Sequence, residues 1–186
     1  VLNQAVGLRL QGASARRERR KRLTIAAREE YSGSDTFQAT LYEGVSTHAV
    51  MLKSYFPDTL ASRLVENRSV SVQRSIPVRV FLNGEFLYDS YMLERYDKRY
   101  FRQHYNVDGF ILVKDGAVHD EDTSSADNIR YQQYMGWISD TDFSDPQEWA
   151  AFQEQTDVQS YIDYIVTNYY LCNIDLSDNH NYVLWR

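Results

Sequence analysis

The Asn83-Gly84 dipeptide, with alternating side chains on both sides, restricts the fold of this chain more than any other feature. Both central residues of a two-residue hairpin turn need a positive φ, which Asn and Gly adopt more readily than other residues. Apolar or aromatic side chains recur before and after the dipeptide: Val78, Val80, Leu82, Phe86, Tyr88 and Tyr91. The sequence therefore predicts an antiparallel hairpin over residues 77–93, in the middle of a sheet.

Further short strands are predicted on the N-terminal side of this hairpin. Residues 6–10 alternate as a strand should, and residues 23–27 form an apolar run after a basic stretch, so two strands joined by a cationic loop are expected. Apolar segments at 37–42 and 49–52 are predicted as two more strands. A helix from Pro57-Asp58 to about Asn67 follows them. Residues 1–95 are thus expected to form a strand-rich lobe.

Residues 96–186 are predicted to be mainly helical. Four helices are expected: at 97–104, at 126–138, after the start signal Asp145-Pro146, and at 157–172. A small hairpin around Asp115-Gly116 and a last strand at 182–185 are also predicted. Apolar residues recur every three or four positions in the last helix, which predicts a buried face: Val158, Tyr161, Ile162, Ile165, Tyr169 and Cys172. The predicted fold class is α+β, an antiparallel sheet lobe followed by a helical part, in a single domain over 1–186.

Composition limits the partners that this chain can have. The formal net charge of −6 disfavours nucleic acid as the main partner, although six cations occur in seven positions: Arg16, Arg17, Arg19, Arg20, Lys21 and Arg22. Such a run fits a solvated face, a nucleic-acid patch or a phosphate-binding loop. A single cysteine, Cys172, excludes an internal disulfide and is expected to be a small packing residue. No apolar run is long enough to span a bilayer.

A polar loop at residues 173–181 joins the last helix to the last strand. It holds two carboxylates, three side-chain amides and one imidazole. Oxygen ligands on short side chains suit Mg²⁺ or Mn²⁺, and the spacing from Asp175 to Asn179 is typical of phosphoryl-transfer loops. In those loops the Asp receives the substrate hydroxyl proton and the Asn holds a metal. The alternative is a polar turn in which Asp and Asn bond their own backbone, with Asp178 and His180 as ordinary loop residues.

Four segments of the chain, in this order, resemble the CotH kinase family of atypical, protein-kinase-like enzymes, which is named for a spore-coat protein. They are Gly12-Ala13-Ser14-Ala15-Arg16 with Lys21-Arg22-Leu23 and Arg28-Glu29-Glu30-Tyr31; residues 77–86; Leu93-Glu94-Arg95-Tyr96-Asp97-Lys98; and Tyr161-Ile162-Asp163-Tyr164 with Asn173-Ile174-Asp175 and residues 179–186. The resemblance spans nearly the whole chain. It implies an atypical protein-kinase-like fold that uses ATP with Mg²⁺ or Mn²⁺.

The resemblance also implies roles for particular residues. It makes Asp175 the catalytic-loop aspartate, Asn179 the metal-binding amide, and Arg16, Lys21, Lys53 and Glu94 the residues that bind the nucleotide. Lys21 resembles the phosphate-binding lysine, for which neighbouring cations could substitute. Glu94 resembles the carboxylate that closes the nucleotide cleft; alternatively, it pairs with Arg95 or Lys98 at the surface. Because a nucleotide bridges both lobes, the basic loop at 16–22 is expected to face the same cleft as Asp175.

The chain departs from the family pattern at three places. Leu176-Ser177 stands where relatives commonly have an aromatic residue and Pro, Pro57 replaces a usual Arg, and Lys53 replaces another. The resemblance further implies a second metal-binding aspartate beyond Arg186. Loss of a metal carboxylate costs orders of magnitude in rate, so weak ATP binding with negligible turnover is expected from these 186 residues.

Two functions of different classes follow from this comparison. The first is phosphoryl transfer to a hydroxyl of a protein substrate in the parent protein. The second is a non-catalytic interaction domain that binds a coat or cell-surface protein, which would place the chain at the spore coat or the cell surface. Nucleic-acid binding through the basic run ranks below both, because no stacking platform or reading helix accompanies it.

Overall fold

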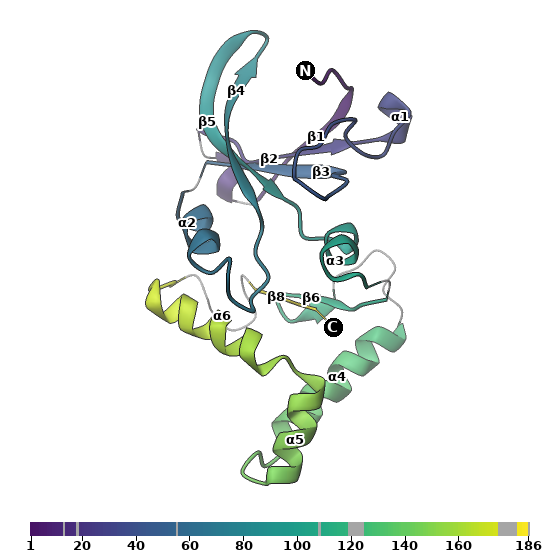
Figure 1. The fold of residues 1–186 in the computed structure, drawn as a ribbon, viewed down its shortest axis with the longest axis vertical. Helices are drawn as coiled ribbons and strands as arrows, with labels where there is room; N and C mark the ends of the chain where they lie inside the picture. Colours follow the sequence, from purple (N-terminus) through teal and green to yellow (C-terminus); the bar gives the residue numbers. More distant parts are fainter. Residues whose placement is uncertain are drawn as a thin grey trace. The chain divides into compact units, whose positions relative to one another are not determined.

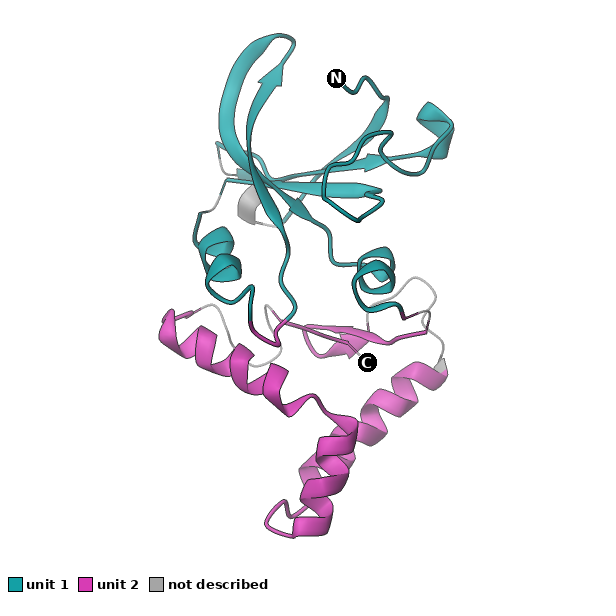
Figure 2. Ribbon diagram, viewed as in Figure 1, with its two compact units in different colours: residues 1–67, 71–106 teal, residues 68–70, 107–186 magenta. Residues whose placement is uncertain are grey.

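A computed structural model describes residues 1–12, 14–17, 19–54, 56–107, 109–118, 125–174 and 182–185 (Figure 1). These residues form two compact units (Figure 2). The first unit comprises residues 1–67 and 71–106, and the second comprises residues 68–70 and 107–186. Among the described residues, no helix is both long enough and apolar enough to cross a membrane.

An antiparallel sheet of five strands, in the order β1-β2-β3-β5-β4, is the framework of the first unit. The strands are β1 (Val6–Leu10), β2 (Leu23–Ala27), β3 (Ala49–Lys53), β4 (Ser75–Leu82) and β5 (Glu85–Glu94). All five strands begin or end within about one residue of the predicted segments, and β4 begins two residues before the predicted start at Pro77. The predicted α+β fold class, with an antiparallel N-terminal sheet, is confirmed.

The predicted hairpin between β4 and β5 is also confirmed, but its predicted place in the middle of the sheet was wrong, because β4 is an edge strand. Asn83 and Gly84 both have a positive φ, of 52° and 86°, and the two strands pair from Ser75↔Leu93 to Leu82↔Glu85. The register shifts between Val80 and Phe81, where β5 contributes one extra residue. Such a bulge bends the hairpin and leaves its apolar tip away from the core.

Helices α2 (Phe56–Leu64) and α3 (Lys98–Tyr105) and the short α1 (Glu29–Ser32) complete the first unit, with a 3₁₀ turn at Ser14–Arg17. Helix α3 begins where the Asp97 side chain accepts hydrogen bonds from the backbone N–H groups of Arg99 and Tyr100, at 3.0 and 3.2 Å. These bonds satisfy donors that the first turn of a helix leaves unpaired. The helix ends at Asn106, whose φ of 55° is left-handed.

The core of the first unit lies where β3, β5 and α3 meet. Val50, Leu93 and Phe101 are each at most 2% exposed. Val50 and Leu93 point to opposite faces, because Val50 pairs with Glu94 and Met51 with Leu93. The central strands β3 and β5 are therefore buried on both faces, as interior strands of a covered sheet must be.

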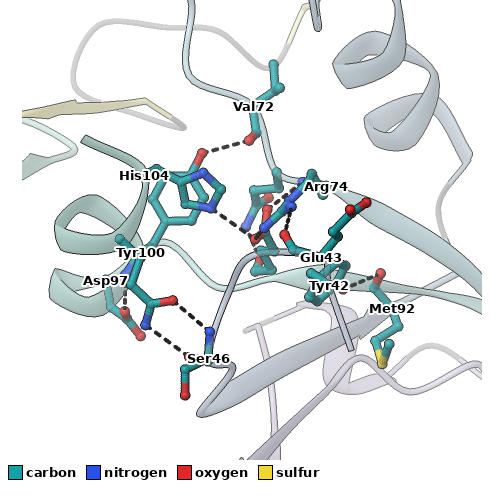
Figure 3. A network of polar contacts seen from close by, with 12 residues as sticks. Tyr42, Glu43, Ser46, Val72, Arg74, Met92, Asp97, Tyr100 and His104 are labelled. Atoms are coloured by element: carbon teal, nitrogen blue, oxygen red, sulfur yellow. Dashed lines mark hydrogen bonds and ion pairs between the residues drawn. The ribbon is translucent and has the colours of Figure 1, made fainter. Parts of the chain in front are cut away.

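The prediction of a strand at residues 37–42 was wrong. The structure has bends and a turn there, with an isolated bridge between Tyr42 and Val45. Tyr42 is buried and its hydroxyl donates to the backbone carbonyl of Met92 at 2.8 Å (Figure 3). The segment thus covers the sheet with one aromatic ring instead of joining it, so its apolar residues need no strand geometry.

The second unit combines a three-stranded sheet with three helices. Strands β6 (Leu112–Lys114), β7 (Ala117–Val118) and β8 (Val183–Trp185) pair in the order β7-β6-β8. Asp115 and Gly116, with φ of 52° and 78°, form the predicted turn between β6 and β7. Helices α4 (Ser125–Asp140), α5 (Pro146–Gln155) and α6 (Val158–Tyr170) follow.

The prediction of a buried face on the last helix was wrong. Helix α6 has no buried residue, and Tyr169 is 79% exposed. It also ends earlier than predicted: Cys172 follows the helix with a left-handed φ of 49° and is exposed, so it is not a packing residue. The backbone N–H of Asn173 donates to the carbonyl of Asn168 at 2.9 Å, which closes the helix end.

Candidate functional site

The cations of the sequence-predicted nucleotide site gather at one end of the five-stranded sheet. Leu10 pairs with Leu23, and Leu23 pairs with Leu52. The basic loop, which we define as Arg16, Arg17 and residues 19–22, joins β1 to β2 at this end. Lys53 is the last residue of β3 at the same end. The structure therefore brings the basic loop and Lys53 to the same end of the strands of this sheet.

Hydrogen bonds tie the basic loop to itself and to the sheet. The Lys21 ammonium donates to the backbone carbonyl of Arg16 at 2.6 Å, so two of the predicted nucleotide-binding residues are in direct contact. The hydroxyl of Tyr88 donates to the carbonyl of Lys21 at 2.9 Å. At the base of the loop, the backbone N–H of Gln11 donates to the carbonyl of Arg22 at 2.9 Å.

Four of the five arginine side chains of the basic loop are exposed to solvent. Arg16, Arg17, Arg19 and Arg20 are exposed, whereas Lys21 and Arg22 are half-buried. A guanidinium carries donors in a planar fork that matches two oxygens of one phosphate, and it stays charged at all ordinary pH values. This donor set fits a chain of phosphate groups.

Lys53 forms an ion pair with Asp58 of α2, with 3.4 Å between Nζ and Oδ2. The two side chains are 21% and 41% exposed. The pair links the end of β3 to the helix that follows it. Sequence reasoning singled out Lys53 and missed Asp58, although the five-residue separation across a strand-to-helix connection is a usable signal.

Glu94 lies in a buried polar network with Arg74 and His104, which are labelled in Figure 3. Its carboxylate accepts hydrogen bonds from the backbone N–H of Arg74 at 3.0 Å, from the Arg74 guanidinium at 2.7 Å and from His104 Nε2 at 3.0 Å. Burial raises the pKa of Glu94, but the hydrogen bonds from Arg74 and His104 outweigh it and hold the pKa below its ordinary value. Because an ionised carboxylate can only accept, His104 Nε2 carries a proton here.

This environment differs from the surface pairing considered for Glu94. The side chain is buried and pairs with Arg74 and His104 instead of Arg95 or Lys98. Arg74 also donates to the Glu43 carbonyl at 2.8 Å and lies over the Tyr42 ring at 5.4 Å. The chain gave no local signal for these partners, because Arg74 precedes Glu94 by 20 positions and His104 follows it by ten.

Glu94 and Lys53 do not share a face of the sheet. Lys53 pairs with Tyr91, and Val50 pairs with Glu94. Directly opposed residues point to the same side, and successive residues of a strand alternate. Tyr91 and Glu94 are three positions apart, so their side chains, and with them Lys53 and Glu94, point to opposite faces.

A second carboxylate–histidine pair lies close to Glu94 in the first unit. His48 Nε2 lies 2.8 Å from Oδ2 of Asp97. Burial raises the pKa of Asp97, but the hydrogen bond and charge of His48 outweigh it and lower the pKa overall. His48, Glu94 and His104 line one shallow pocket together with Thr47 and Arg99. Among the residues that the structure describes, no three His, Cys, Asp or Glu side chains are grouped to hold a metal ion.

Asp175 and Asn179, the predicted catalytic and metal-binding residues, lie outside the described residues. The elements on either side of their loop are described: α6 ends at Tyr170 and β8 begins at Val183. Backbone hydrogen bonding anchors the second of these elements, since the Asp115 N–H donates to the Tyr182 carbonyl at 3.2 Å. That the basic loop faces the same cleft as Asp175 stays a prediction.

Comparison with known families shows to which family the chain belongs. A family model described as CotH kinase protein matches residues 8–186. The chain belongs to the CotH kinase family. A search of curated proteins gave no sequence match. Membership of the CotH kinase family, together with the α+β structure, makes this a kinase-like domain. A kinase-like domain suggests the use of a nucleotide and a divalent metal.

The residues described for this CotH kinase domain fit the phosphate part of such a ligand. The basic loop and Lys53 supply cations at one edge, and the Lys53–Asp58 pair joins a strand lysine to the carboxylate of the next helix. In protein kinases a pair of this kind, between a strand lysine and a helix glutamate, must be in place for transfer. The predicted metal ligand, Asn179, lies outside the described residues, and its amide oxygen is a ligand type that suits Mg²⁺.

Proposed function

We propose that this CotH kinase domain binds ATP with Mg²⁺ or Mn²⁺ and, in its parent protein, transfers the γ-phosphoryl group to a hydroxyl of a protein substrate. Family membership supports the class of reaction. Nucleotide binding is supported by one observation: the basic loop and Lys53 lie at the same end of the five-stranded sheet. In a chain of net charge −6, a cluster of this sign selects an anionic ligand.

Each proposed residue has one task in this reaction. The arginines of the basic loop and Lys53 neutralise phosphate oxygens. Asn179 would hold the metal, which would offset negative charge on the phosphates when bound. Asp175 accepts the proton of the substrate hydroxyl. The hydroxyl oxygen then forms a bond to the γ-phosphorus while the bond to the β–γ bridging oxygen breaks, and ADP leaves.

Binding and turnover are proposed to separate in this chain. Cations suffice to hold the phosphates, whereas transfer requires the metals to keep the γ-phosphoryl group in line with the hydroxyl. The family resemblance puts a second metal-binding aspartate beyond Arg186. A longer form that includes this aspartate is therefore the form in which phosphate transfer should be measured.

Calorimetry with ATP and Mg²⁺ or Mn²⁺ tests the binding step. Arg17→Ala should weaken ATP binding about three- to tenfold, as expected for the loss of one hydrogen bond of ordinary net strength at a solvated surface. Arg79→Ala is the matched control, because Arg79 is an exposed arginine of β4 that pairs with Asp89. Equal affinities for both variants would show that the basic loop does not bind the nucleotide.

Phosphate transfer from radiolabelled ATP tests the chemical step in the longer form. Asp175→Asn should abolish transfer, because an amide cannot accept the hydroxyl proton as a carboxylate does. Asp178→Asn removes the other carboxylate of the same loop and should leave most activity. Retained transfer in Asp175→Asn would remove Asp175 from its proposed role, and full activity of the 186-residue chain would show that the second aspartate is unnecessary.

A non-catalytic interaction domain is the second candidate function. The tip of the β4–β5 hairpin favours it, because four large apolar side chains there are about half exposed: Phe81, Leu82, Phe86 and Leu87. Exposed apolar patches of this kind mark protein contacts. Absence of ATP binding in both chain lengths would favour this function, with a coat or cell-surface protein as the proposed partner.

A further inference from the structure

A buried tyrosine of β5 touches the basic loop through its hydroxyl. Tyr88 is 6% exposed and pairs with Val80 of β4 in the sheet. Its hydroxyl donates to the backbone carbonyl of Lys21 at 2.9 Å, across 67 positions of sequence. Burial raises the pKa of Tyr88, so the hydroxyl keeps its proton and remains a donor. The contact joins the middle of the sheet to the loop between β1 and β2.

Lys21 is held at both of its ends. Its carbonyl accepts from Tyr88, and its ammonium donates to the Arg16 carbonyl at 2.6 Å. The resulting chain of contacts runs from β5 through Lys21 to the first arginine of the loop. The Lys21 side chain therefore closes the loop on itself, while four arginine side chains of the loop remain exposed: Arg16, Arg17, Arg19 and Arg20.

The loop needs such ties because its charges repel one another. Like charges a few ångströms apart at a solvated surface cost on the order of 1 kcal/mol per pair, which favours an open, spread loop. An anionic ligand that had to order the loop would bind more weakly, because the entropy cost of ordering reduces the binding free energy. A loop already held by the partly buried Tyr88 hydrogen bond and by the Lys21–Arg16 contact avoids that loss.

We propose that Tyr88 is a positioning residue for nucleotide binding, whose hydroxyl fixes the basic loop so that its arginines converge on the phosphates. The proposal rests on the proposed function for its ligand, ATP, and on the structure for the anchoring. Tyr88 itself touches no phosphate in this scheme. Its effect is therefore on the affinity for the nucleotide and not on the transfer step.

Tyr88→Phe tests this role because it removes the hydroxyl and keeps the buried ring. Tyr100→Phe is the matched control: Tyr100 is also 6% exposed and lies in the first unit, and its hydroxyl donates to the Val72 carbonyl at 2.7 Å. Each variant loses one partly buried hydrogen bond to a backbone carbonyl. Only Tyr88 contacts the basic loop.

The first measurement is amide hydrogen exchange at residues 19–22 in the protein without nucleotide. Tyr88→Phe should accelerate exchange there about three- to tenfold, which corresponds to the net worth of one hydrogen bond. Tyr100→Phe should leave exchange at residues 19–22 unchanged. Unchanged exchange in Tyr88→Phe would overturn the anchoring, and with it the proposal, whether or not the wild-type chain binds ATP.

The second measurement is the affinity for ATP with Mg²⁺ and, in the longer form, the kinetic constants. Tyr88→Phe should weaken binding and raise KM for ATP about three- to tenfold with kcat unchanged; a merely structural loss would lower the active fraction and hence kcat. Faster exchange with unaltered affinity would overturn the positioning role. If the wild-type chain binds no ATP, the proposed function and the nucleotide part fail together, while the exchange data decide the anchoring separately.

Discussion

Replacing Glu94 with Gln tests whether the buried network at the end of β5 stabilises the first unit. Glutamine keeps the shape of the side chain but loses the charge. Its amide N–H group would also face the N–H donors of Arg74 and His104, where the carboxylate supplies an acceptor. Breaking a buried ion pair by neutralising one partner costs about 3–5 kcal/mol. The Arg74 side chain is 38% exposed, so water compensates part of this loss, and we expect a destabilisation of about 2–3 kcal/mol.

The assay must follow the first unit alone. All three tryptophans of the chain, Trp137, Trp149 and Trp185, lie in the second unit. Tryptophan fluorescence therefore reports the second unit, and hydrogen exchange of the β5 amides reports the first. We expect protection of the β5 amides to fall by about 30- to 150-fold in Glu94→Gln, which is the same free energy expressed as a rate ratio.

An exposed ion pair of the same sheet provides the control. Arg79 and Asp89 lie 3.6 Å apart with side chains 78% and 71% exposed, and Asp89→Asn should cost less than about 0.5 kcal/mol. Equal and small losses in Glu94→Gln and Asp89→Asn would refute the argument that burial makes the Glu94 network important. A loss in Glu94→Gln confined to the tryptophan signal would refute its assignment to the first unit.

Three further outcomes are expected. The folded-state pKa of Glu94 lies below its ordinary value of 4.5. The stabilisation that ionised Glu94 contributes is therefore present above pH 4.5 and is lost as pH falls through the folded pKa. Between about pH 6 and 3, protection of the β5 amides from exchange should thus fall less steeply in Glu94→Gln than in wild type. Gly84→Ala should destabilise the hairpin by about 1–2 kcal/mol in the same exchange assay, since Gly84 has φ +86° and the added methyl group meets open space. Gly136→Ala, in the middle of α4 with open space around it, should have the opposite sign and stabilise α4 by up to about 1 kcal/mol in thermal unfolding followed by tryptophan fluorescence.

The elements that sequence reasoning predicted correctly are those with a local cause. Asn83-Gly84 dictates its own turn, and the Asp145-Pro146 signal starts α5, where the Asp145 side chain accepts from the Gln147 N–H at 2.8 Å. Asp97 similarly begins α3 within one residue of the predicted start. In each case the information needed lies within about four residues, so no tertiary contact has to be known.

The features that sequence reasoning missed depend on distant partners. Glu94 meets Arg74 and His104 only because β5 and α3 fold together, and no spacing rule connects these positions. Tyr42, at the end of residues 37–42, covers the sheet without joining it, and a strand pattern cannot distinguish these two arrangements. The periodicity of α6 correctly predicts a helix, but it carries no information about whether another element covers the apolar face.

The alternation that separates Lys53 from Glu94 makes β3 and β5 intolerant of changes in length. Deleting one residue between Tyr91 and Glu94 would turn the Glu94 carboxylate to the Lys53 side and remove it from Arg74 and His104, because every side chain beyond the deletion changes face. Insertions beside Gly84 carry no such consequence, since they lengthen a turn at the end of the hairpin. Members of the CotH kinase family that share this sheet should therefore vary in length at the hairpin tip. They should keep the same number of residues between Tyr91, which pairs with Lys53, and Glu94.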